Sequence, residues 1–237
     1  MAFLVVPEPF DFELTTERFR AFGVDRASLW HEGGLHRVVG GREVRIEAAA
    51  GGVEVEPLDA ETEPVVPRLL GFRPSVAPDP FEMLVGAITS QQVSLFSALA
   101  IRNRMIERFG ERAVEAWAFP TRARLAAVRE EELVAVGFSW RKAEYVVGLA
   151  RSDVDLYALA ALPDEDVRAR LVALRGIGAW TAEWFLARHL ARPHAWPAGD
   201  LALRKAVAPL DVDLARVRFH PFENLSAHYL LLSNRVP

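Results

Sequence analysis

Apolar and polar residues alternate along the first third of the chain, as they do in β-strands. In residues 43–48, Val44, Ile46 and Ala48 alternate with charged residues, the pattern of a strand with one buried and one solvated face. Pairs of glycines separate this run from similar ones, and such pairs predict hairpins. The strand-like runs are 28–31, 35–39, 43–48 and 53–57. We therefore predict an antiparallel meander, packed against a short helix over residues 15–22.

The pattern changes beyond a proline-rich linker at residues 61–80. From Phe81 onward, apolar residues recur three and four positions apart, which is typical of helices that bury one face. The predicted helices are 81–109, 121–127, 130–136, 140–150, 164–174, 180–190, 201–207 and 222–232. The predicted fold class is mainly α with an α+β N-terminal domain. Residues 1–72 would form a small antiparallel α/β domain, and residues 73–237 an all-helical domain.

The composition excludes several classes of protein. The chain has no cysteine, which excludes disulfides, thiolate zinc sites, iron–sulfur clusters and a thiol nucleophile. No apolar run reaches the length of a membrane span. The run Phe3–Val6 is short and lacks a basic leader, so we expect no signal peptide and a cytoplasmic protein.

Charge is distributed unevenly along the chain. The net charge is −4, but residues 1–72 carry 7 basic and 13 acidic side chains, whereas residues 140–237 carry 13 basic and 11 acidic ones. Because basic side chains attract phosphates, we expect any nucleic-acid contact in the C-terminal half. Only two of the 28 basic residues are lysines, Lys142 and Lys205, which leaves few amine nucleophiles.

A glycine-rich turn separates two predicted helices at Leu-Arg-Gly-Ile-Gly-Ala-Trp-Thr-Ala, residues 174–182. Gly176 and Gly178 let the chain reverse and leave backbone N–H groups uncovered. The second helix starts at this point, so its positive end and the amides both favour a phosphate. Backbone amides read no bases, so such a contact would position the protein on DNA without specifying sequence. A plain turn between helices also explains these residues.

Asp200 opens the predicted helix 201–207 after the run Trp-Pro-Ala-Gly. Aspartate is a favoured N-cap, and capping alone explains its presence. A carboxylate at a helix start is also placed to stabilise a developing cation, the more so beside apolar residues that exclude water. Both roles remain open for Asp200 from the residues alone.

Together, the hairpin and the aspartate resemble the helix-hairpin-helix DNA glycosylase superfamily. Its signature is this hairpin, then a helix, then a glycine- and proline-rich loop that ends in an aspartate, here Pro-Ala-Gly-Asp at 197–200. The hairpin sequence is similar to the 3-methyladenine DNA glycosylase II (AlkA-like) branch. Residues 80–94, 137–143 and 9–12 resemble further segments of that branch. The resemblance implies a helix-hairpin-helix glycosylase domain over residues 73–237.

The resemblance also implies roles for individual residues. Asp200 would be the catalytic carboxylate. The base pocket would be formed by Trp180, Trp184, Tyr229 and Leu231. Contacts to DNA would come from Gln91, Gln92, Ser139, Arg175, Gly176, Gly178, Thr181 and Arg204. Of these, Gln91 and Gln92 match the positions that fill the gap left by a flipped base. For Arg175 and Arg204, a solvated helix surface explains the charge equally well, and a core position explains Trp184.

No organic cofactor and no side-chain metal site is expected. The resemblance implies at most a monovalent cation held by the backbone carbonyls of Leu174 and Ile177 in the hairpin.

The residue choices narrow the expected reaction. Members of the family with lyase activity carry a lysine in the hairpin, where this chain has Trp180. We therefore predict a monofunctional glycosylase, which hydrolyses the N-glycosidic bond without cutting the strand.

No second acid is evident, which favours alkylated purines such as 3-methyladenine and 7-methylguanine, because these cationic bases leave without protonation. Electron-rich rings would hold them by cation–π attraction. Leu231 stands at a pocket position where relatives usually have an aromatic residue. Tyr229 or His228 could compensate for the missing ring.

Two other functions remain open. One is a glycosylase of the same fold for deaminated, etheno or oxidised bases. The other is a non-catalytic DNA-binding protein that uses the hairpin as a phosphate clamp. In each case the expected partner is double-stranded DNA, with a damaged base for the enzymes. We expect a monomer that is associated with the nucleoid, does not contact membranes and acts in base excision repair of alkylation damage.

Overall fold

The computed structural model describes residues 2–6, 10–63 and 77–233. Contacts divide the chain into two compact units, Met1–Asp153 and Val154–Pro237. The predicted domain boundary at residues 72 and 73 lies outside the described residues and stays a prediction. Among the described residues, no helix is both long and apolar enough to cross a membrane.

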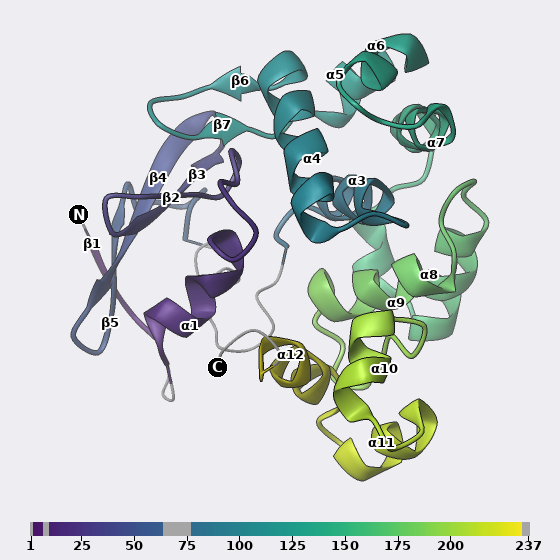
Figure 1. The fold of residues 1–237 in the computed structure, drawn as a ribbon. Helices are drawn as coiled ribbons and strands as arrows, with labels where there is room; N and C mark the ends of the chain where they lie inside the picture. Colours follow the sequence, from purple (N-terminus) through teal and green to yellow (C-terminus); the bar gives the residue numbers. More distant parts are fainter. Residues whose placement is uncertain (1, 7–9, 64–76, 234–237) are drawn as a thin grey trace. The chain divides into compact units, whose positions relative to one another are not determined.

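The first unit contains a five-stranded antiparallel sheet (Figure 1), with strand order β1-β5-β4-β3-β2. The strands are β1 (Ala2–Val5), β2 (Leu29–His31), β3 (Gly34–Val39), β4 (Arg42–Ala49) and β5 (Gly52–Glu56). In the central strands, Ile46 pairs with Leu35 on one side and with Val55 on the other. These fully buried side chains form one face of the sheet, which confirms the predicted meander. Strand β1 was not predicted, because its short run shows no turn signal before it.

A short helical segment covers the buried face of the sheet. Helix α1 (Phe12–Thr16) continues into the 3₁₀ turn η1 (Glu17–Phe19). Phe12 and Phe19 pack into the core formed by the sheet. The helix begins before the predicted residue 15, because the Asp11 carboxylate accepts the N–H of Leu14 at 2.9 Å and caps it.

The remaining elements of the first unit are mainly helices (Figure 1). They are α3 (Pro80–Ser90), α4 (Leu95–Phe109), α5 (Arg122–Ala126), α6 (Glu130–Ala135) and α7 (Trp140–Arg151), with the strands β6 (Glu111–Arg112) and β7 (Trp117–Ala118). The single helix predicted over 81–109 was wrong. The chain breaks after Ser90, and Ser94 caps a new helix by accepting the N–H of Ser97.

The pair β6–β7 corrects the prediction that residues beyond 72 are wholly helical. A carboxylate on β4 explains the hairpin. Glu43 accepts the N–H groups of Val114, Glu115 and Ala116 at 2.7–3.0 Å, and its other oxygen contacts His36. Burial would raise the pKa of Glu43, but these hydrogen bonds outweigh it and lower the pKa below the ordinary value of 4.5. No local sequence pattern predicts a hairpin held from this distance. With that exception, the predicted fold class is confirmed.

A buried ion-pair network joins strand β3 to helices α3 and α4. Glu82 on α3 pairs with Arg37 of β3 and, at 2.6 Å, with Arg102 of α4. Arg102 also pairs with Asp25. Glu82 and Arg37 are both buried, so each charge depends on its partners for the solvation that it has lost.

Glu82→Gln should destabilise the protein by about 3–5 kcal/mol, because it leaves two buried guanidinium groups without their shared carboxylate. The measurement is urea unfolding. Glu107→Gln is a matched control, since Glu107 also pairs with an arginine, Arg26 at 2.7 Å, but both side chains are about 40% exposed. The control should cost less than about 1 kcal/mol. An equal loss of stability in the two variants would show that burial does not strengthen the Glu82 ion pairs.

The second unit is helical throughout its described part. It contains η2 (Ala158–Ala161), α8 (Asp164–Val172), α9 (Ala179–Arg188), α10 (Leu201–Val207), α11 (Val212–Phe219) and α12 (Glu223–Ser233). Its core includes the fully buried Leu171, Phe185 and Leu203. Helix α11 was not predicted. Leu214 and Val217 are exposed on it, so its apolar residues do not follow one buried face. Its start is fixed by Asp211, which caps it.

Candidate active site

The glycine-rich hairpin joins α8 to α9, as predicted. Gly176 has φ 88°, a left-handed conformation that glycine adopts without strain. Ile177 is buried and fixes the turn to the core, and its N–H donates to the carbonyl of Leu174 at 3.1 Å. That bond occupies one lone pair of the Leu174 oxygen, and a carbonyl has two. The cation expected at these carbonyls therefore stays a prediction.

Gly178 is the N-cap of α9, and its backbone is extended, with φ −103° and ψ 180°. Any residue can adopt this conformation. A side chain placed there would meet nothing of the chain within 4 Å. Neither the backbone nor the packing requires glycine at this position. Its missing side chain instead leaves the N-terminal turn of α9 open to close approach from outside, which suits an anion.

The Asp200 carboxylate accepts four hydrogen bonds. One oxygen, Oδ1, accepts the backbone N–H groups of Ala202 at 2.9 Å and Leu203 at 3.1 Å, so Asp200 caps α10 as predicted. The other, Oδ2, accepts the indole N–H groups of Trp180 and Trp184, each at 3.0 Å. Because an ionised carboxylate only accepts and an indole N–H only donates, this geometry matches the charged form. The carboxylate is therefore held in one orientation from both sides.

The two tryptophans lie one helical turn apart on α9, and this spacing lets both reach the same oxygen. Their exposure differs. Trp180 is half-buried, whereas Trp184 is only 2% exposed. The Arg188 guanidinium lies 4.0 Å over the Trp184 ring. A base could stack on Trp184 only if its neighbours moved, so in this arrangement Trp184 holds the carboxylate, and Trp180 is the more accessible ring.

Helix α12 contributes His228 to the surroundings of this pair. The His228 ring meets the Trp184 ring edge-on, with centroids 5.5 Å apart and planes at 86°. Leu231, the predicted replacement for an aromatic, is buried. Tyr229 is 41% exposed, and partial burial raises the pKa of its side chain. Tyr229, Leu231 and His228 were the residues considered for the usual aromatic of the base pocket. Of these, His228 has a ring contact with Trp184.

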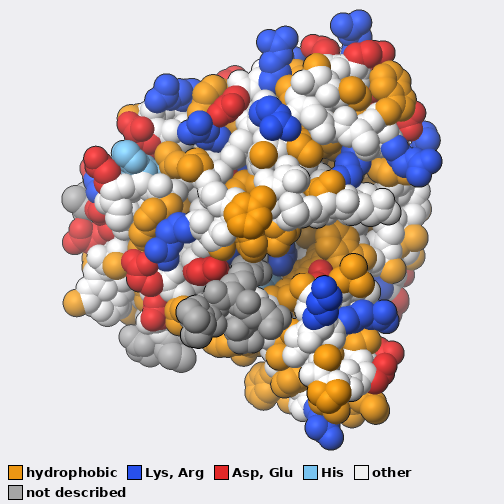
Figure 2. Space-filling model, in the orientation of Figure 1, with side chains coloured by type: hydrophobic (Ala, Val, Ile, Leu, Met, Phe, Trp, Pro, Cys, Tyr) orange, Lys and Arg blue, Asp and Glu red, His pale blue; other side chains and the backbone are white. Residues whose placement is uncertain are grey.

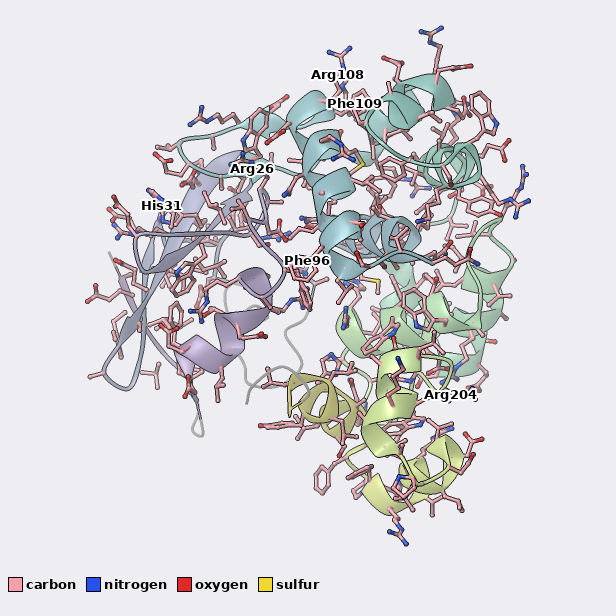
Figure 3. All side chains as sticks on the ribbon, in the orientation of Figure 1. Arg26, His31, Phe96, Arg108, Phe109 and Arg204 are labelled. Carbon is pink, nitrogen blue, oxygen red and sulfur yellow. The ribbon has the colours of Figure 1, made fainter. Side chains whose placement is uncertain are left out.

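The predicted DNA contacts of the second unit lie in different environments. Thr181 is 1% exposed, so its side chain cannot reach a phosphate without rearrangement. Arg175 is exposed in the hairpin. Arg204, labelled on α10 in Figure 3, is exposed and donates from Nε to the carbonyl of Ala198 at 2.9 Å. This hydrogen bond holds the loop at Ala198, two residues before Asp200. Over α9 and α10, Figure 2 shows Lys and Arg side chains beside hydrophobic ones.

The other predicted DNA contacts lie in the first unit. Gln91 and Gln92 form the break between α3 and α4, and Gln92 is exposed with φ 55°, an uncommon conformation for a residue other than glycine. Phe96, labelled in Figure 3, lies at the start of α4, is 62% exposed and forms part of the hydrophobic surface seen there in Figure 2. Ser139 is exposed and caps α7 by accepting the N–H of Lys142.

Trp184→Phe should destabilise the protein by about 1.5–3 kcal/mol, because it removes a partly buried hydrogen bond from a buried ring to a carboxylate. Trp140→Phe is the matched control. Trp140 donates to the Glu144 carboxylate at 3.1 Å but is exposed, so its loss should change stability by no more than about 0.5 kcal/mol. Urea unfolding measures both.

The effect of Trp184→Phe should also shrink when Asp200 is already alanine, because the two residues are coupled. If Trp184→Phe lowers stability equally in the Asp200→Ala protein, the effect comes from lost packing and not from the hydrogen bond.

Comparison with known proteins gives consistent results. A family described as "HhH-GPD superfamily base excision DNA repair protein" matches residues 85–217, more than half of the chain. The DNA-3-methyladenine glycosylase of Bacillus subtilis is 31% identical over 144 residues, which cover 57% of this chain and 48% of that protein. The chain thus spans about half the length of the first curated relatives that it matches.

Solved structures agree with this result. A 3-methyladenine DNA glycosylase from Archaeoglobus fulgidus has a TM-score of 0.86 at 24% identity, covering 99% of this chain and 98% of that chain. This likeness extends over the sheet and the helices and shows a shared fold. The 3-methyladenine DNA glycosylase of Schizosaccharomyces pombe, in complex with abasic DNA, is 26% identical with a TM-score of 0.59, covering 76% of this chain and 94% of that chain.

Proposed function

Because the chain belongs to the HhH-GPD superfamily of base excision DNA repair proteins, we propose that it is a monofunctional DNA glycosylase for alkylated purines in duplex DNA. The observation that carries the proposal is the Asp200 carboxylate, oriented by two indole and two backbone N–H groups. The relatives named as 3-methyladenine DNA glycosylases support the substrate class. A non-catalytic phosphate clamp would need Asp200 only as a helix cap, a role that does not require the two indole donors.

Cleavage of the N-glycosidic bond develops positive charge on the sugar. Asp200 stabilises this charge and, as a base, activates the attacking water. Since its oxygens are already oriented, little reorganisation is needed when the charge develops. An alkylated purine is itself cationic and leaves without a proton, so one carboxylate is sufficient. The half-buried Trp180 ring provides a π-face for such a base.

The target base must leave the duplex before it can react. We assign Gln92 to the gap that remains, because it is exposed in the strained break between α3 and α4. The amides at Gly176 and Gly178 bind a phosphate, and the exposed Arg175 adds positive charge. These contacts position duplex DNA without reading its sequence.

Asp200→Asn should lower excision on the order of 10²–10³-fold, the range found when a group that stabilises transition-state charge is removed. Release of free base from duplex oligonucleotides that contain 7-methylguanine, hypoxanthine, ethenoadenine or 8-oxoguanine is the measurement. Asp211→Asn is a matched control. Asp211 caps α11 as Asp200 caps α10, accepting the N–H groups of the second and third residues after it at 2.9 and 3.3 Å. The control should excise at the wild-type rate.

Each other outcome of this assay contradicts a stated part of the proposal. Full excision by Asp200→Asn would remove the carboxylate from the mechanism. Faster release of the neutral bases than of 7-methylguanine would overturn the substrate class. A wild-type protein that binds DNA and releases no base would be a phosphate clamp.

The proposed enzyme has no lyase activity, because the hairpin position of a nucleophilic lysine is occupied by Trp180. Lys142 donates its Nζ to the carbonyl of Thr89 at 2.8 Å, and Lys205 lies on α10. Wild type should leave abasic DNA uncut and yield no covalent adduct with borohydride. An adduct that disappears in Lys142→Gln or Lys205→Gln would contradict this prediction and identify the nucleophile.

A further inference from the structure

Two histidines and a buried glutamate lie close together in the second unit, and none of them is hydrogen-bonded to Asp200 among the described contacts. Glu223 opens α12 and is 3% exposed. One of its oxygens lies 3.0 Å from Nδ1 of His194, and the other lies 2.9 Å from Nδ1 of His220. The two imidazole rings stack, with centroids 5.2 Å apart and planes at 22°. One possible ligand atom from each residue lies within 4.8 Å of the others.

The backbone around this cluster is fixed by hydrogen bonds. His194 follows Pro193, whose carbonyl accepts the N–H of Asn224 at 3.0 Å. The Asn224 side chain donates to the carbonyl of Ala187 at 3.2 Å, at the end of α9. His220 ends α11. The loop after α9, the end of α11 and the start of α12 are thus joined before any ligand binds.

We propose that His194, His220 and Glu223 bind a divalent transition-metal ion of the zinc class. Two imidazoles and one carboxylate are a donor set that zinc accepts, with the fourth position left to water. Donor atoms around a tetrahedral zinc ion lie about 3.3 Å apart, given bond lengths of about 2.0–2.1 Å. The distances of 3.0 and 2.9 Å run to different oxygens of Glu223. With one donor atom taken from each residue, all three atoms lie within 4.8 Å of one another, so side-chain movements of the two exposed histidines would bring them to this spacing.

The burial pattern also suits a metal site. The carboxylate is buried and already oriented, whereas the side chains of His194 and His220 are 50% and 65% exposed. Solvent can therefore deliver an ion from the imidazole side. A neutral imidazole carries its single proton on either ring nitrogen, so each ring can move that proton from Nδ1 to Nε2 and bind the ion through Nδ1. The ion would replace both hydrogen-bonded protons and bind the same three groups more tightly.

Such an ion would act on the loop that carries Asp200. His194 lies six residues before Asp200, between α9 and α10. The same loop contains the buried Trp196, whose Nε1 donates to the carbonyl of Val212 at 3.1 Å. A metal that links His194 to α11 and α12 would therefore restrict the loop at its start. We assign this site a structural role, since the donors that orient Asp200 are Trp180 and Trp184 and not the histidines.

The test is titration of the full-length, metal-free protein with Zn²⁺ by calorimetry and with Co²⁺ by visible absorption. Wild type should bind one equivalent, and Co²⁺ should give ligand-field bands of a nitrogen- and oxygen-ligated ion. Zinc should also raise the melting temperature, because it binds only the folded arrangement. The double variant His194→Asn/His220→Asn should bind roughly 100-fold more weakly or not at all, since loss of a supporting contact alone costs about 10–100-fold.

His31→Asn is the matched control. His31 is also partly exposed and lies 3.9 Å from the carboxylate of Glu32, so it reports incidental binding by a surface histidine. It should bind zinc as wild type does. The side chains of His194 and His220 are exposed, so the double variant should fold. Thermal unfolding of the metal-free double variant will show that it does. Absence of binding by wild type, or equal binding by the double variant, would overturn the proposal and leave the cluster a hydrogen-bonded structural triad. Neither result bears on base excision, which the Asp200 variants test.

Discussion

The second unit depends on one carboxylate that is satisfied from two directions. Asp200 accepts the first free amides of α10 and the indole N–H groups of two residues on α9. These bonds fix the loop between the helices, orient the tryptophan rings and keep a negative charge in a setting that is partly protected from water. Removal of either set of donors would leave the charge with half of its partners. Capping and the proposed catalysis thus use the same geometry, because both need a carboxylate that does not rotate.

A second carboxylate in this unit is held in a similar way by different chemistry. Burial would raise the pKa of Glu223, but hydrogen bonds with His220 and His194 lower it to about 2. The rings around Asp200 are indoles, which only donate a proton and cannot bind a metal. Those around Glu223 are imidazoles, which can exchange that proton for a metal ion. A carboxylate with two ring N–H partners is therefore proposed to support a reaction at one site and to bind an ion at the other.

Local sequence determined a large part of the fold and of the candidate site. The alternation around Val44 and Ile46 predicted the meander, and the hairpin followed from the glycines at 176 and 178. Asp200 was predicted as a cap from its place before a helix, and its catalytic role, which the resemblance implies, stays a proposal. The predictions of the meander, the hairpin and the cap succeed because periodicity, turns and caps depend on neighbours within a few residues. The break between α3 and α4 was missed, because Ser94 caps a helix inside a continuous apolar pattern.

Which distant groups meet depends on the packing of the folded chain. Sequence spacing placed Trp180 and Trp184 on one face, but only the fold showed both indoles on one oxygen of Asp200 and Trp184 buried beneath Arg188. The spacing of His220 and Glu223 is visible in the sequence, whereas His194 lies 26 positions before His220 and is joined to them only by the packing of loop and helices. Contacts of this kind depend on chain paths that no local pattern contains. Local patterns therefore identified most of the elements and the candidate carboxylate, whereas the packing of the chain set the partners of that carboxylate.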